Sequence, residues 1–119
     1  MLGRMPGEHE MDATSGAAVV TLQGELDAHD ASRLREHFAA ALADASEDAS
    51  SPRLVLDLEA VDFLDSTALG AIVGALRRTR EAGGEVGIVL PAGSARRIFE
   101  ITGLDAILDV YPSRAAALA

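Results

Sequence analysis

The sequence contains no cysteine, lysine, asparagine or tryptophan. Without cysteine the chain forms neither disulfides nor thiolate metal sites, and we predict neither a metal nor a cofactor. The absence of lysine excludes a P-loop, whose phosphate-binding motif requires one. Aromatic residues are 3% of the chain, so stacking platforms for single-stranded nucleic acid are scarce. Leucine, isoleucine, valine and alanine must therefore form the core.

Length and charge narrow the class of protein further. At 119 residues and 49% hydrophobic content, the chain suits one globular domain. Ten basic residues stand against nineteen acidic ones, for a net charge of −9. A surface that neutralises phosphates needs clustered basic residues, so nucleic-acid binding is disfavoured and a protein partner is favoured.

Two further absences concern location. No apolar run reaches the length that spans a bilayer, and residues 1–16 hold no apolar stretch typical of a signal peptide. We therefore expect a cytoplasmic protein without membrane insertion. Residues 1–16 mix glycine, proline and acids and are predicted to form a flexible tail, followed by one domain over 17–119. The oligomeric state stays open.

Hydrophobic patterning predicts alternating strands and helices. The expected strands are 18–23, 54–58, 85–90 and 108–111, and the expected helices are 31–43, one that begins at 66 or 67, 94–102 and 113–119. Glycines 83 and 84 should end the second helix, and Gly103 the third. This order predicts an α/β fold with a mostly parallel sheet of four to five strands, flanked by about four helices.

The junction Asp65-Ser66-Thr67 follows an apolar strand and opens a helix. Functional groups of open α/β sheets lie past the carboxyl ends of the strands. A helix N-terminus also offers free N–H groups and a positive dipole end, which suit a phosphate. Two interpretations stay open from spacing alone. Ser66 either caps its helix, a role worth about 1 kcal/mol, or is itself modified. Asp65 is interpreted as a cap or a loop residue.

The helix after this junction carries an apolar stripe and two glycines. The predicted buried stripe is Leu69, Ile72, Val73 and Leu76. Gly70 and Gly74 lie on another face, where each costs up to about 1 kcal/mol relative to alanine. Tight packing within the domain or close approach of a partner would explain them.

Enzymatic chemistry finds little support. A nucleophilic serine needs a base, yet His9 lies in the expected tail, and His29 and His37 lie beside or on the first helix. The surroundings of Ser66 also differ from the G-x-S-x-G elbow of hydrolases. A phospho-aspartate receiver built on Asp57 would need a lysine on a late strand. We therefore predict that the chain is not an enzyme.

Several motifs occur in the order typical of one family. They are Gly24-Glu25-Leu26-Asp27, Asp65-Ser66-Thr67-Ala68-Leu69-Gly70, Gly83-Gly84-Glu85 and Ile101-Thr102-Gly103-Leu104. Together they resemble a STAS domain, specifically a bacterial anti-sigma factor antagonist, over residues 17–119. The family pattern has glycine where this chain has Ala68, whose methyl group we expect to restrict the approach of a partner.

The resemblance implies a phosphoprotein that regulates transcription by partner switching. Ser66 would be phosphorylated by an anti-sigma factor with serine kinase activity. The unphosphorylated form would bind that factor and release the sigma factor, and a serine phosphatase would reset the phosphorylated form. ATP would belong to the kinase. The implied docking residues are Asp27, Asp65, Ser66, Thr67, Gly70, Gly74 and Arg77.

Two alternatives remain. STAS-like domains also serve as binding subunits of lipid-transport complexes or of stress-sensing assemblies. A small nucleotide bound near Asp27 and Ser66 is a weaker option. A neighbouring anti-sigma kinase gene would favour the anti-sigma factor antagonist, and a transporter operon would favour the binding subunit of a lipid-transport complex.

Overall fold

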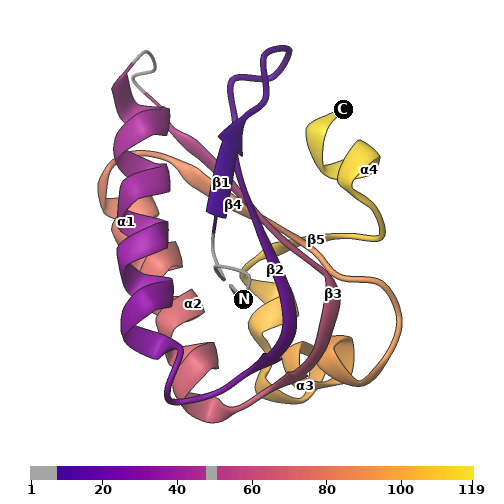
Figure 1. Ribbon diagram of the computed structural model, residues 1–119. Coiled ribbons are helices and arrows are strands. Elements are labelled where there is room, and N and C mark those ends of the chain that lie inside the picture. The colour runs from indigo at the N-terminus through magenta and orange to yellow at the C-terminus, as the bar shows by residue number, and fades with distance from the viewer. Residues whose placement is uncertain (1–7, 48–50) are drawn as a thin grey trace.

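The computed structural model describes residues 8–47 and 51–119, in which strands and helices alternate (Figure 1). The strands are β1 (Glu8–Met11), β2 (Ala18–Leu26), β3 (Arg53–Leu64), β4 (Glu85–Val89) and β5 (Asp109–Tyr111). The helices are α1 (Ala31–Glu47), α2 (Ser66–Glu81), α3 (Ser94–Thr102) and α4 (Arg114–Leu118), with a 3-10 turn η1 at Leu104–Ala106. No helix in the described ranges is long and apolar enough to cross a bilayer.

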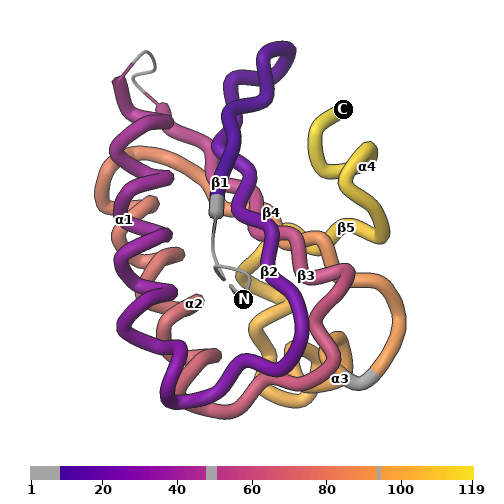
Figure 2. Tube along the Cα trace, in the orientation of Figure 1, coloured from indigo at the N-terminus to yellow at the C-terminus, as the bar shows by residue number. Residues whose placement is uncertain are grey.

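The five strands form one sheet in the order β1-β2-β3-β4-β5. β1 pairs antiparallel with β2, whereas β2, β3, β4 and β5 pair in parallel. Consecutive parallel strands are joined by helices, as the chain path shows (Figure 2). The predicted fold class, α/β with a mostly parallel sheet and four helices, is confirmed.

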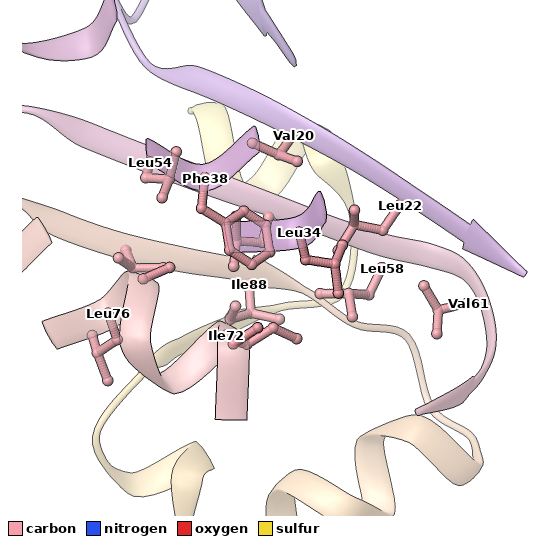
Figure 3. Close-up of a cluster of buried hydrophobic side chains, with 14 of the residues drawn as sticks. Val20, Leu22, Leu34, Phe38, Leu54, Leu58, Val61, Ile72, Leu76 and Ile88 are labelled. Carbon is pink, nitrogen blue, oxygen red and sulfur yellow. The ribbon is translucent and has the colours of Figure 1, made fainter. Parts of the chain in front are cut away.

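The main core lies between the sheet and helices α1, α2 and α3 (Figure 3). Alternate residues of β2 point into it, among them Val20 and Leu22, each 0% exposed. Phe38 from α1 and Ile72 from α2 meet them there. Aliphatic side chains dominate, as the scarcity of aromatic residues required.

The opposite face of the sheet is covered by α4. Val19, Val55 and Val89 pack there against Ala117 in a separate, smaller cluster. Figure 1 shows α4 on the side of the sheet away from α1 and α2. The sheet therefore lies between α1, α2 and α3 on one face and α4 on the other. The carboxyl ends of β2 and β3 lie at one edge of this arrangement, where a site can form.

Some predicted boundaries were wrong. Residues 8–11 form β1 and so belong to the domain, not to the tail expected over 1–16; residues 1–7 lie outside the described ranges. β3 extends to Leu64, well past the predicted end at residue 58, because β2 also continues beyond Gly24 and supplies backbone partners. A register shift beside Gly24, which has φ of 79°, accommodates this extension.

The connection from α2 to β4 depends on two glycines, as predicted. Gly83 adopts a left-handed conformation with φ of 82°. A side chain on Gly84 would collide with the Pro52 carbonyl oxygen, which accepts a hydrogen bond from the Glu85 N–H at 3.0 Å. Only glycine allows this close approach of backbone to backbone.

Candidate functional site

The candidate site lies where the parallel strands β2 and β3 end side by side. Leu26 and Leu64 are register partners at this edge, and the Asp65 N–H donates to the Leu26 carbonyl at 3.1 Å. The loop after β2 and the start of α2 are therefore adjacent. This places Asp27 and Ser66, which are distant in sequence, at one end of the sheet.

Asp65 is the N-cap of α2. Its backbone is extended (φ −88°, ψ 174°), and its Oδ1 accepts a hydrogen bond from the Ala68 N–H at 2.9 Å. Its Oδ2 accepts from the Ala28 N–H at 3.0 Å and so holds the neighbouring loop. The interpretation of Ser66 as the cap is therefore wrong.

Ser66 is instead the first residue of α2, and it is exposed. Its hydroxyl takes part in none of the hydrogen bonds found within 8–47 and 51–119. The adjacent Thr67 is exposed as well. A hydroxyl at this position lies close to the positive end of a helix of 16 residues. The Ser66 hydroxyl is therefore accessible from solvent.

Asp27 shapes the loop beside Ser66. Its Oδ1 accepts a hydrogen bond from the His29 N–H at 2.9 Å, and its own N–H donates to Asp30 Oδ2 at 3.0 Å. These local hydrogen bonds give the loop a defined conformation. Asp27 thus lies near the start of α2 with part of its carboxylate committed to the loop.

Beyond its first turn, α2 presents an open face formed by the remaining predicted docking residues. No atom of another element lies within 4 Å of a Cβ placed on Gly70 or Gly74. Tight packing within the domain therefore does not explain these glycines. Arg77 is exposed and follows Ser66 by eleven residues, about 16 Å along the helix axis at 1.5 Å per residue.

The buried side of α2 differs from the predicted stripe. Its buried residues are Ala68, Ala71, Ile72, Ala75, Leu76 and Thr79, while Leu69 and Val73 are only partly buried. Ala68 is 0% exposed, so its methyl group packs into the core and cannot meet a partner. The expected obstruction by Ala68 was wrong.

Phe63 is a surface feature that the sequence-based site did not include. It lies near the end of β3, two residues before Asp65, and is 50% exposed. The sequence could have indicated Phe63, because it is one of few aromatic residues in the chain and lies beside Asp62 and close to Asp65. Large exposed apolar side chains beside polar groups are common anchors of protein interfaces.

The arrangement combines an exposed hydroxyl, a helix N-terminus and an open helix face. It lacks the pairing of a serine with a histidine base, since no hydrogen bond within the described ranges joins Ser66 to a histidine. Nor do those ranges contain a group of three or more histidine, aspartate or glutamate residues arranged to hold a metal. The geometry favours recognition by another macromolecule.

Comparisons with known proteins agree on one family. The STAS domain model matches residues 8–117. The anti-sigma F factor antagonist of Paenibacillus polymyxa is 29% identical over 92% of this chain and 90% of its own length. An anti-sigma factor antagonist from Mycobacterium paratuberculosis has a solved structure with a TM-score of 0.76 and 32% identity, covering 92% of this chain and 89% of that chain.

A third similarity concerns fold alone. The Bacillus cell fate determinant SpoIIAA, solved in its phosphorylated form, aligns with a TM-score of 0.67 and 24% identity. The alignment covers 92% of this chain and 95% of that one. The sheet and helices described above are thus shared along nearly the whole of both chains.

Proposed function

Because the chain belongs to the STAS domain family, we propose that it is an anti-sigma factor antagonist controlled by phosphorylation of Ser66. In its unphosphorylated form it binds an anti-sigma factor with serine kinase activity and so releases a sigma factor. Phosphorylation ends that interaction, and a serine phosphatase restores it. The names of its relatives in Paenibacillus and Mycobacterium support the antagonist role.

The observation that carries the proposal is the position of Ser66. Asp65 takes the capping role, which leaves the Ser66 hydroxyl exposed and free to accept a phosphoryl group. The phosphoryl group would come from ATP bound by the kinase: the serine oxygen attacks the γ-phosphorus, the serine proton passes to a base of the kinase, and the bond from the γ-phosphorus to the bridging oxygen breaks to release ADP. This chain needs no cofactor of its own for that step.

Phosphorylation would act on the interface and not on the fold. A phosphate adds about −1.5 to −2 charges, and the N-terminal end of a helix dipole favours negative charge. Ser66 is exposed, so the phosphate stays in water and no buried group must move. The added charge and volume would instead block whatever partner surface covers this position.

The docking surface that we propose follows the open face of α2 from its first turn. Its residues are Asp27, Asp65, Ser66, Thr67, Gly70, Gly74 and Arg77. The two glycines allow a partner backbone to approach α2 closely, and nothing within the domain uses that space.

A phosphorylation assay tests the proposal. The purified protein is incubated with ATP and with each anti-sigma factor kinase of its source organism, and intact mass is measured. We expect one added phosphate on the wild-type protein, none on Ser66→Ala, and one on the matched variant Thr67→Ala. Labelling of Ser66→Ala at Thr67 would show that the acceptor is misassigned.

A binding assay with the same kinases tests the switch. Ser66→Asp is expected to keep the wild-type circular dichroism spectrum and thermal midpoint while losing at least about tenfold in affinity. Unfolding of Ser66→Asp would contradict the interface mechanism. Absence of binding and of labelling with every kinase would contradict the antagonist role itself.

A further inference from the structure

An apolar groove runs along the carboxyl-terminal half of α2, away from Ser66. It is an open surface hollow of about 440 Å³, lined by Val73, Leu76, Arg77, Arg80, Glu81 and Ile107. Ile107, which follows η1, is 48% exposed and forms one wall. Val73 is partly buried in the other wall. The floor is thus hydrophobic while the rim carries charges.

The two walls of the groove are joined by a hydrogen bond. The Arg80 guanidinium donates from Nη2 to the Ile107 carbonyl oxygen. This contact holds the segment after η1 against α2 and commits Arg80 to the scaffold. Arg77 takes part in no ion pair or hydrogen bond within the described ranges of the chain. Its charge on the rim is therefore available to a ligand.

The charge at this end of α2 is opposite to that of the whole protein. The chain carries −9 overall, yet Arg77, Arg78 and Arg80 cluster within one turn. The other end of the same helix lies beside Asp27 and Asp65. α2 therefore presents a surface that is acidic near Ser66 and basic near the groove.

We propose that the groove receives an apolar side chain from a segment of the anti-sigma factor, with an acidic residue beside it that pairs with Arg77. This rests on the proposed function and names the chemistry of the partner's contact. Ser66, Gly70, Val73 and Arg77 recur at i, i+4, i+7 and i+11, which places them on one side of α2. A partner that covers Ser66 thus reaches the groove by continuing along the helix.

The length of the combined surface fits one interface. Ser66 and Arg77 are separated by about 16 Å along α2, and a standard protein interface buries about 800 Å² on each partner. The apolar groove supplies a buried anchor and Arg77 a charged rim contact, the usual division within such interfaces. The opposite charges at the two ends of α2 fix the direction in which the partner lies.

Two matched pairs of variants test this inference. Arg77→Glu is compared with Arg78→Glu, which makes the same change in net charge one residue away and outside the groove lining. Ile107→Ser is compared with Ile101→Ser, because Ile101 is also exposed, at 76%, and lies outside that lining. Affinity for the anti-sigma kinase that labels Ser66 is measured at low and high salt, with thermal unfolding as the check on folding.

We expect Arg77→Glu and Ile107→Ser each to weaken binding at least about tenfold, and their two controls to weaken it less than about threefold. Arg77→Glu should also reduce the salt dependence of association, since a rim charge acts largely on the rate of encounter. If Ile107→Ser fails to fold, the comparison of Arg77→Glu with Arg78→Glu still tests the inference.

Equal effects within both pairs would overturn the inference while leaving the proposed function intact, provided that Ser66 is labelled and Ser66→Asp loses affinity. Failure of the wild-type protein to bind any kinase would overturn both. A weakening of binding by Arg77→Glu that grows at high salt would also contradict the proposed ion pair.

Discussion

The Asp65 carboxylate accepts a hydrogen bond from the backbone N–H of Ala28, 37 residues earlier, at 3.0 Å. The same carboxylate caps α2 through the Ala68 N–H. One side chain thus sets both where the helix begins and where the loop after β2 lies. The position of Ser66 as the first residue of α2 follows from this double contact.

Replacing Asp65 should therefore cost stability as well as partner binding. We expect Asp65→Ala to lower the free energy of unfolding by about 1–2 kcal/mol, because the helix cap and the loop contact are both lost. Asp65→Asn, whose amide oxygen can still accept a hydrogen bond, should lose less. Urea denaturation measures both. The exposed neighbour Asp62→Ala is the control and should stay within about 0.5 kcal/mol of wild type.

Gly70 should show a conflict between stability and binding. Gly70→Ala is expected to raise the free energy of unfolding by up to about 1 kcal/mol, since alanine is the better helix former and the added methyl meets no atom of the domain. The same methyl should weaken binding of the anti-sigma factor by entering the space that a partner backbone would use. Thermal unfolding and titration calorimetry measure the two effects.

The control for Gly70 lies on α1, where Ala40 is exposed. Ala40→Gly should lower stability by a similar amount and leave the affinity for the anti-sigma factor unchanged. If Gly70→Ala instead destabilised the protein, or left the affinity at its wild-type value, the glycine would have a role other than partner approach.

The sequence alone was sufficient to predict the α/β class and the ends of α3. Residues 94–102 were predicted and observed as a helix, and Gly103 closes it in the left-handed conformation, with φ of 78°. These features depend on local signals: a short amphipathic stretch followed by glycine. β1 was missed because Glu8-His9-Glu10-Met11 is mostly polar, and its strand conformation comes from pairing with β2.

The identity of the cap could not be predicted for a similar reason. Asp65, Ser66 and Thr67 are all residue types that cap helices, so local preference does not choose among them. The choice depends on Ala28, which approaches only when β2 and β3 pair. The burial of Ala68 could not be predicted from the hydrophobic pattern either. Small alanines line the buried side of α2, whereas the larger Leu69 and Val73 lie at its margin.

The turn between β1 and β2 contains Asp12, whose carboxyl pKa is shifted by hydrogen bonds from Ser15. Hydrogen bonds from the Ser15 hydroxyl, at 2.6 Å, and from the Ser15 N–H, at 2.8 Å, hold the pKa of Asp12 below its ordinary value of 3.8. A carboxyl whose folded pKa is depressed stabilises the fold above its unfolded pKa, and this stabilisation is lost as the pH falls through the folded pKa.

Ser15→Ala removes the hydroxyl donor, so it should raise the pKa of Asp12 towards 3.8 while the backbone hydrogen bond remains. Titration of the Asp12 carboxyl followed by NMR measures the shift. The control is Ser46→Ala, whose hydroxyl donates to the Leu42 carbonyl within α1, and it should leave the Asp12 pKa unchanged. A Ser15→Ala variant with a lower Asp12 pKa would contradict this account.

Arg114, the first residue of α4, joins this helix to three strands of the sheet. Its guanidinium donates to Asp57 Oδ2 at 2.9 Å, to Glu10 Oε1 at 2.9 Å and to Thr21 Oγ1 at 2.7 Å. Partial burial disfavours its charge, but hydrogen bonds and charges from Asp57 and Glu10 outweigh this and raise the pKa of Arg114. The Asp57 residue itself is only 5% exposed.

Arg114→Met should therefore lower the free energy of unfolding by about 1–3 kcal/mol, because among residues 8–47 and 51–119 Asp57 then keeps only the Glu59 N–H as a hydrogen-bond donor. Glu10→Gln, at the exposed end of the same network, should cost less than about 1 kcal/mol. A double-mutant cycle with Asp57→Ala isolates the coupling, which we expect at about 1–3 kcal/mol. Equal losses for Arg114→Met and Glu10→Gln would show that the buried Asp57 contact does not stabilise α4.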